Sequence, residues 1–279
     1  MKENLKVHKD YKDNILVDKD SPILAMKANR DRYTDSSPKM EKYLGLPQVG
    51  SIYSEDALTW NVFRTLEFNK SFSVLEPVLG ELKNPRTLYW TYAASPEAAD
   101  LQFIVGDAIR QIDGRFGRQI TEPDIIIATD DRFILIEAKL GRPNVAPSHL
   151  WAGSVDGPAL RASYYFIKNP HPFVAKHDEK LYAGACYQLY RMAFYCHLVG
   201  SKLKLHPELV SLANEKTWTM HKPSHGSAQD SWGLFQKEIA PGKLDIRACF
   251  WQQIRTCIQQ NKKPGLAPLR ERLENHICL

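Results

Sequence analysis

The sequence predicts an α/β fold in which helices surround a mixed central sheet. Apolar residues recur at helical spacing in several stretches. Two β-branched runs, "DIIIA" and "RFILIEAKL", are too apolar for strands that expose one face to water. Both faces of their sheet are therefore expected to be covered by helices, which is the layered arrangement of an α/β protein.

Composition sets the broad class of the protein. The chain has 279 residues, of which 43% are hydrophobic and 25% charged, enough for one large domain or two small ones. Its net charge of +5 permits a polyanionic partner without requiring one. The first residues lack an apolar signal core, and no apolar run approaches the roughly 18 residues that span a bilayer. We therefore expect a cytoplasmic protein with no membrane partner. Its five cysteines form no CxxC pair, so free thiols are expected.

Two regions are expected along the chain. Residues 1–50 mix Lys and Asp with few large apolar residues, which predicts a polar, partly disordered N-terminal arm with a short strand at "NILV". Residues 51–279 form the main domain, with insertions at about 95–114 and 141–178 and a C-terminal helix. "NKKPGLAPLRER" near its end is basic, as many solvated surfaces are.

Capping residues mark the first two helices of the main domain. In "SEDALTWNVFRTLEF", Ser54 can cap, and Glu55 and Asp56 lie in the first turn. In the helix at 95–114, Ser95 is the expected cap, Pro96 stands at the first position and Gly114 ends the run.

The remaining elements follow from pattern alone. We expect a strand at 87–94, a helix at "PALRASYYFI", a long helix at "EKLYAGACYQLYRMAFYCHLVG" ending near Gly200, a strand at 216–222 and a late helix at "LDIRACFWQQIRTCIQQ".

The central hairpin gathers three charged residues. If Asp130 and Asp131 form the shortest turn between the two apolar runs, cross-strand partners have residue numbers that sum to 261, and Asp124 faces Glu137. Side chains alternate with period two, so Lys139 lies on the same face as Glu137. A longer loop would keep the three residues near one another without placing them face to face.

Two opposed carboxylates in a sheet call for a cation, because like charges placed directly opposite destabilise the pairing. Mg²⁺ or Mn²⁺ suits an all-oxygen site, and a lysine beside it can balance charge or handle a proton. The alternative is a structural ion pair, in which Asp124 begins a strand at a solvent edge and Glu137 simply pairs with Lys139.

At Pro123-Asp124 and Glu137-Ala138-Lys139 the sequence resembles the PD-(D/E)XK nuclease superfamily, whose fold is called restriction-endonuclease-like. The resemblance covers the hairpin closely and residues 51–225 more loosely. It implies a Mg²⁺- or Mn²⁺-dependent nuclease in which Asp124, Glu137 and the carbonyl of Ala138 hold the metal. Lys139 would orient or activate the attacking water.

The resemblance also suggests residues outside the hairpin. Family members often add a carboxylate from the helix preceding the sheet, for which Glu55 is the candidate and Glu67 a weaker one; helix-dipole complementarity explains Glu55 equally well. Gln188 is the candidate polar residue on the helix after the Glu-Ala-Lys strand, with Tyr187 and Arg191 as companions. A hydrogen-bonded core amide is the alternative for Gln188. Met192 stands where exonuclease branches have Tyr, which argues against an exonuclease.

The expected partner is nucleic acid, DNA more than RNA. Basic residues that could contact phosphates are Lys70, Lys83, Arg86, Arg110, Arg115 and Arg118. A homodimer or a partner protein could supply specificity. The reading favoured by the resemblance is a DNA endonuclease. The alternatives are a non-catalytic nucleic-acid-binding or assembly subunit on the same fold, and an unrelated protein with a structural ion-pair network.

Overall fold

The computed structural model describes residues 7–37, 41–113, 122–140, 187–220, 232–233, 235–237 and 242–276. The chain folds into two compact units. Unit 1 joins Met1–Leu82 to Gln252–Leu279, and unit 2 is Lys83–Trp251. The sequence suggested a boundary between two regions near residue 50, but this is not where the two units meet. Residues on both sides of position 50 and the C-terminal residues all belong to unit 1.

The helices of unit 1 account for all of its named elements among the described residues. In chain order they are η1 (Tyr11–Asn14), α1 (Pro22–Arg30), η2 (Glu41–Tyr43), η3 (Gln48–Gly50), α2 (Glu55–Phe68), η4 (Phe72–Leu75), α3 (Glu76–Leu79), α10 (Trp251–Gln260, from its second residue), η7 (Pro264–Leu266) and α11 (Ala267–Glu274). The Ser54 hydroxyl caps α2 by accepting a hydrogen bond from the Ala57 N–H at 3.2 Å, as predicted. Every α2 residue from 57 to 66 is buried.

The N-terminal segment is part of the packed interior of unit 1 and not a peripheral arm. Ile15 and Leu24 are buried, and Asn14 ends a 3₁₀ helix where the sequence suggested a strand. The Asn14 side chain donates to the carbonyls of Val49 and Ser51 at 2.9 and 2.7 Å. These bonds satisfy a buried amide and fix a segment whose polar composition suggested disorder.

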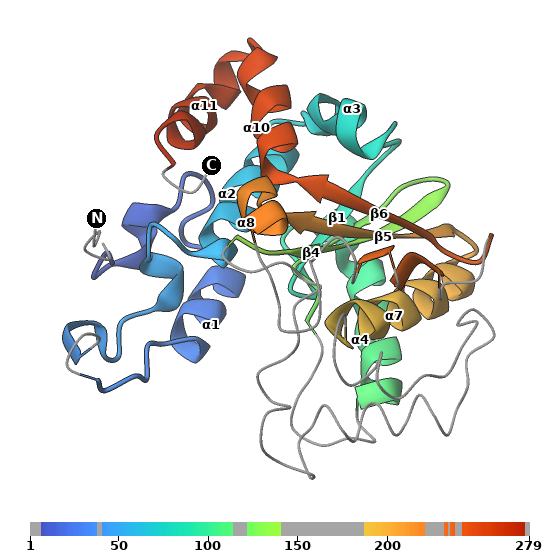
Figure 1. Cartoon of the computed structure of the whole chain (residues 1–279), viewed down its shortest axis with the longest axis horizontal. Helices are drawn as coiled ribbons and strands as arrows, with labels where there is room; N and C mark the ends of the chain where they lie inside the picture. Colours follow the sequence, from blue (N-terminus) through green and yellow to red (C-terminus); the bar gives the residue numbers. More distant parts are fainter. Residues whose placement is uncertain are drawn as a thin grey trace. The chain divides into compact units, whose positions relative to one another are not determined.

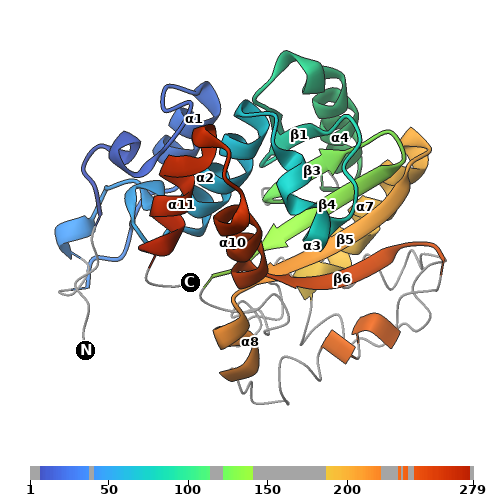
Figure 2. The same ribbon diagram turned by 90° about the horizontal axis from the view of Figure 1, so that it is seen from above.

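Unit 2 contains a six-stranded mixed sheet, which confirms the predicted α/β class. The strands lie in the order β2 (Tyr92–Ala93), β1 (Arg86–Tyr89), β3 (Ile125–Ala128), β4 (Arg132–Ala138), β5 (His206–Ala213) and β6 (Asp245–Phe250). Figure 2 shows this order for β1, β3, β4, β5 and β6. Neighbours from β2 to β4 are antiparallel, whereas β4, β5 and β6 are parallel.

Two helices cover one face of this sheet. α4 (Ala99–Asp113) and α7 (Tyr187–Leu203) pack on it (Figure 1), and their apolar residues share one buried cluster with those of the strands. Leu101 and Val105 come from α4, Leu189 from α7, and Leu135 and Leu209 from β4 and β5. The helix expected to be an insertion at 95–114 is thus part of the core. It begins as a 3₁₀ turn, η5 (Pro96–Ala98), and Ser95 makes no side-chain cap.

The expected strand at 87–94 is a tight hairpin of β1 and β2. Trp90 and Thr91 occupy its turn with φ of 49° and 76°. Both values lie in the left-handed region, as a two-residue hairpin turn of type I′ requires. The sequence carries no Asn-Gly or Asp-Gly signal here, so the turn could not be recognised from its residue types.

Two further predictions after residue 205 are wrong. The segment expected as a strand at 216–222 contains a helix, α8 (Glu215–Met220), whose start is capped by Asn214 Oδ1 accepting from Lys216 N at 3.0 Å. The first part of the expected late helix is β6, because Ile246, Ala248 and Phe250 alternate along a strand that pairs with β5. β5 itself was not predicted from the sequence.

Several sequence predictions concern other features of the chain. The helix at "PALRASYYFI" and the insertion at 141–178 lie outside the described residues. Cys196, Cys249 and Cys257 are free thiols, as expected, and burial raises the pKa of Cys249 to about 11. In the part of the chain that the structure describes, no helix has the length and hydropathy needed to cross a membrane.

Gly200 lies near the end of α7, where the helix packs closely against the start of β5. The helix continues past this glycine to Leu203, so Gly200 is not its terminator. A Cβ at Gly200 would lie 2.9 Å from Pro207 Cβ and 3.2 Å from the Leu205 carbonyl oxygen. The glycine therefore allows α7 to approach the start of β5 closely.

We expect Gly200→Ala to lower the free energy of unfolding by about 1–3 kcal/mol, because the added methyl group overpacks this region. Denaturant titration followed by circular dichroism measures the change. Gly106→Ala in α4 is the matched control, since its Cβ would meet only Arg110 Nη1, at 3.8 Å. That substitution should stabilise by about 0.5–1 kcal/mol through helix propensity. Equal effects at both positions would contradict the close-packing role of Gly200.

Candidate metal centre

The β3–β4 hairpin has the register that the sequence predicted. Ile125 pairs with Ile136 and Ala128 with Phe133, and the Thr129 N–H donates to the Arg132 carbonyl at 2.8 Å across the turn. This two-residue turn at Asp130-Asp131 places Asp124 opposite Glu137 at the other end of the hairpin. We call that end of the sheet the site edge.

Three charged side chains meet at the site edge. Lys139 Nζ lies 2.9 Å from Glu137 Oε1 and 4.0 Å from Asp124 Oδ2. Asp124 is 7% exposed and Glu137 only 1%, so both carboxylates are largely removed from water. The structure therefore brings together Asp124, Glu137 and Lys139, as the sequence predicted.

Backbone hydrogen bonds hold this arrangement in place. Asp124 Oδ2 accepts from the Ala138 N–H at 2.8 Å, so the carboxylate takes the place of a ladder carbonyl. The Trp90 N–H donates to the Asp124 carbonyl at 3.2 Å, and the Lys139 N–H donates to the Leu212 carbonyl at 2.7 Å. The end of β1 thus fixes the main chain at Asp124, and β5 fixes that at Lys139.

The charges of the site favour an additional cation. The three side chains carry two negative charges and one positive charge, and charge in such a largely buried setting is costly unless it is compensated. Carboxylate oxygens and the Ala138 carbonyl are hard donors of the kind that Mg²⁺ and Mn²⁺ prefer. Among the described residues no group of three or more His, Cys, Asp and Glu side chains gathers. Two carboxylates nevertheless fit Mg²⁺, which commonly keeps several waters and uses one or two carboxylates with substrate phosphates.

The other predicted site residues are not brought into this cluster by the interactions that the structure describes. Glu55 is the first residue of α2, in unit 1, whereas the three charged residues belong to unit 2. Glu67 forms an ion pair with Arg64 at 2.7 Å in unit 1. Tyr187 and Gln188 lie in the first turn of α7, and Arg191 lies one turn later. The side chains of these three residues are outside the described part of the structure.

The predicted phosphate-binding residues are divided in the same way. Arg86 forms an ion pair with Asp100 at 2.8 Å, and the Lys83 carbonyl accepts from the Asp130 N–H at 3.2 Å, beside the hairpin turn. Arg110 is exposed at the surface of α4. Of the others, Lys70 belongs to unit 1, and Arg115 and Arg118 lie outside the described residues.

Sequence reasoning missed Ser211, which β5 places beside Glu137. The parallel register pairs Glu137 with Ser211, and Ser211 is 0% exposed. The alternation of "ELVSLA" could have shown it, because Ser211 interrupts the apolar positions Leu209 and Ala213.

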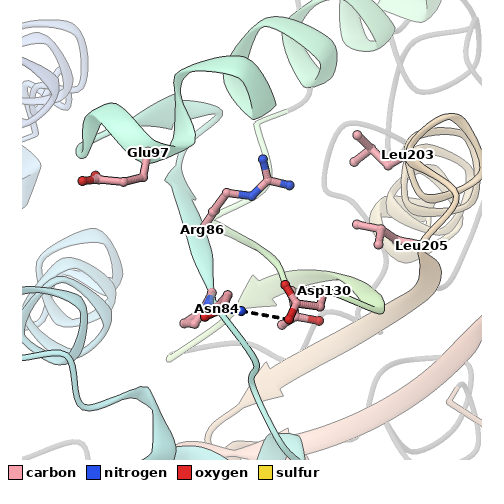
Figure 3. Close-up of a pocket in the computed structure, with 8 residues that line it drawn as sticks. Asn84, Arg86, Glu97, Asp130, Leu203 and Leu205 are labelled. Atoms are coloured by element: carbon pink, nitrogen blue, oxygen red, sulfur yellow. Dashed lines mark hydrogen bonds between the residues drawn. The ribbon is translucent and has the colours of Figure 1, made fainter.

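A separate cavity of about 550 Å³ lies at the opposite end of the hairpin. Its lining residues are Asn84, Pro85, Arg86, Glu97, Thr129, Asp130, Leu203 and Leu205. Figure 3 shows Asn84 hydrogen-bonded to the turn residue Asp130, with an Nδ2–Oδ2 distance of 2.9 Å. Because Asp130 and Asp124 stand at opposite ends of β3, this cavity does not include the candidate metal centre.

Comparisons with protein-family models, with curated proteins and with solved structures found no match for this chain.

Proposed function

We propose that this protein is a metal-dependent phosphodiesterase that cleaves nucleic acid, with DNA as the favoured substrate and internal cleavage as the favoured mode. The observation that carries the proposal is the convergence of Asp124, Glu137 and Lys139 at one edge of the sheet. The predicted register gives this convergence a simple cause, since a two-residue turn requires it. A mixed sheet flanked by helices also agrees with the resemblance to PD-(D/E)XK nucleases.

The residues have distinct chemical roles in this proposal. A bound Mg²⁺ or Mn²⁺ would supply Lewis-acid stabilisation of the charge that builds on the phosphate oxygens. Asp124, Glu137 and the Ala138 carbonyl would hold the ion. Lys139 lies within reach of both carboxylates and is 23% exposed at its side chain, so its ammonium can also face the substrate side. There it would orient the attacking water or take its proton.

The same ion pairs support a second reading, in which the three residues only stabilise the hairpin. Lys139 compensates one carboxylate at 2.9 Å, as a structural ion pair would. A non-catalytic nucleic-acid-binding subunit is a third reading. Metal binding and cleavage distinguish these possibilities, because a structural ion pair needs neither and a binding subunit needs no cleavage.

The test is cleavage of supercoiled plasmid by the wild type and by Lys139→Ala, with Mg²⁺, Mn²⁺ or EDTA. We expect metal-dependent nicking or linearisation that falls at least about 100-fold in the variant, as when a group acting in the transition state is removed. Lys202→Ala is the matched control, because Lys202 on α7 is also a partly exposed lysine of unit 2, ion-paired with Asp107 at 3.8 Å. If the protein neither cleaves the plasmid nor binds metal in calorimetry, the remaining interpretation is that the three residues only stabilise the hairpin. Metal binding without cleavage would favour the binding subunit.

A further inference from the structure

Four basic residues of unit 1 gather where the end of α2 meets the turn between α10 and α11. We call them the basic corner; they are Lys70, Lys262, Lys263 and Arg270. α11 packs beside α2 (Figure 2). Lys263 Nζ donates to the Lys70 carbonyl and to the Ser71 hydroxyl at 3.4 and 3.1 Å. Arg270 Nη1 donates to the carbonyls of Asn261 and Lys263 at 2.6 and 3.0 Å, so residues distant in sequence are joined at one place.

No carboxylate side chain belongs to the two segments that form the basic corner. Residues 69–75 and 261–270 contain its four cations and neither Asp nor Glu. None of the four forms an ion pair with a described residue. Elsewhere in unit 1, by contrast, Lys27 and Arg64 each pair with two carboxylates. The described residues therefore leave the positive charge of the basic corner available to a partner.

The cations of the basic corner are accessible, and two of them are held in place. Lys70, Lys262 and Lys263 are exposed, and Arg270 is half-buried. The hydrogen bonds of Lys263 Nζ and Arg270 Nη1 restrict both side chains, so a ligand that contacts them has less side-chain entropy to remove. Nε and Nη2 of Arg270 make no hydrogen bond with a described residue, so their N–H groups can donate to a ligand.

Nucleic acid is the polyanion that suits this arrangement. Its phosphates are exposed and regularly spaced, so several lysine and arginine side chains on one surface can contact them at once. Each contact releases condensed counter-ions, which is the source of affinity that does not depend on sequence. A small anion needs donors that converge on one point, whereas Lys70 and Lys262 stand on separate, exposed segments.

We propose that the basic corner is a surface of unit 1 that binds the phosphate backbone of nucleic acid. This inference deepens the proposed function and rests on it for the identity of the polyanion. The surface is separate from the candidate metal centre, whose residues belong to unit 2. Contacts to phosphates position a duplex without reading its bases, so the basic corner contributes affinity and not sequence specificity.

The test measures binding without metal or cleavage. A fluorescent DNA duplex of about 20 base pairs is titrated with the full chain in EDTA, and anisotropy gives Kd at several salt concentrations. The variant combines Lys70→Gln with Lys262→Gln, because neither side chain makes a hydrogen bond or ion pair with a described residue. At about 0.1 M salt it should bind about 10- to 100-fold more weakly. The slope of log Kd against log salt should fall by about two, roughly 0.9 for each lost phosphate contact.

The matched control combines Lys9→Gln with Lys19→Gln. Both lysines are exposed residues of unit 1, so this variant loses the same charge, but each is followed directly by an aspartate. Its affinity should stay within about twofold of the wild type, with an unchanged salt slope. Lys70→Arg with Lys262→Arg keeps both charges and should also bind as the wild type does.

The outcomes separate the two proposals. An unchanged affinity and salt slope in Lys70→Gln with Lys262→Gln overturns the binding surface, because the lysines would then only complement the ends of α2 and α10. An equal loss in the control also overturns it, as does a wild type that binds no duplex. If the variants bind as expected but the wild type cleaves no plasmid with Mg²⁺ or Mn²⁺, the surface stands and the proposed cleavage fails.

Discussion

Asp124→Asn is expected to reduce metal-dependent plasmid cleavage by about 10³-fold while the protein stays folded. Lewis-acid stabilisation by a bound metal contributes several kcal/mol to such a reaction, and each 1.36 kcal/mol is worth a factor of about ten. The asparagine keeps a carbonyl oxygen that can accept from the Ala138 N–H, now 2.8 Å from Asp124 Oδ2. The substitution thus removes the charge and leaves the backbone bond.

This variant separates the two tasks of Asp124. Cleavage rates with saturating Mg²⁺ and thermal unfolding of the same preparation would be measured together. Asp124→Ala removes both the charge and the acceptor, so it should lose cleavage and stability, the latter by about 1–3 kcal/mol for an unsatisfied buried N–H. If Asp124→Asn unfolds as readily as Asp124→Ala, the carboxylate is chiefly structural.

The same hairpin supplies the control for charge. Asp130 lies at the opposite end of β3, is exposed and accepts from Asn84 Nδ2 at 2.9 Å. Asp130→Asn also removes one negative charge and retains an acceptor. It should leave cleavage within about twofold of the wild type, because an exposed charge far from the reaction is screened by solvent. A large loss in Asp130→Asn would point to the hairpin turn as part of the working site.

Local rules were sufficient to predict the convergence of charged residues at the site edge. Period-two alternation and the shortest possible turn together placed Asp124 opposite Glu137, and both are properties of a few consecutive residues. Helix α2 was predicted for a similar reason, since Ser54 is followed by acidic residues and then by helical apolar spacing. These features depend little on what the rest of the chain does.

Features that depend on distant partners were not predicted. β5 pairs with β4 and β6 across long stretches of sequence, and its Pro207 stands before β6 begins to pair at Glu208. Pro207 therefore pairs with β4 alone, and the absence of its N–H is tolerated because no second strand pairs at that position. Ser211 was missed with the strand that carries it. The Trp90-Thr91 turn was missed because the surrounding sheet imposes left-handed values on residues that seldom adopt them.

The largest expected loss of stability comes from Glu208, on the other face of β5 from Ser211. Glu208 is 2% exposed and pairs with Arg132 on β4 at 3.0 Å. Arg247 on β6 forms a second ion pair with the same carboxylate. One buried carboxylate thus compensates two guanidinium groups and links the three parallel strands.

Glu208→Gln should lower the free energy of unfolding by about 3–5 kcal/mol, because it removes a buried carboxylate that is ion-paired with two guanidinium groups. The true value should lie near the lower end of that range, since the Arg247 side chain is 35% exposed and solvent can screen its charge. Guanidinium chloride also screens charge, so urea titration is the suitable measurement. Asp100→Asn is the control, because the more exposed Arg86–Asp100 pair should contribute less than about 1 kcal/mol.

A third variant shows whether the charge balance or the shape of Glu208 matters. Replacing all three residues together, as Glu208→Met, Arg132→Leu and Arg247→Leu, removes every charge of the network and should recover most of the stability that Glu208→Gln loses. Because side chains alternate along β5, Glu208 faces away from Ser211 and Glu137. Folded Glu208→Gln should therefore bind Mn²⁺ as the wild type does. Weakened binding in the folded variant would mean that the two faces of β5 are coupled through the strand itself.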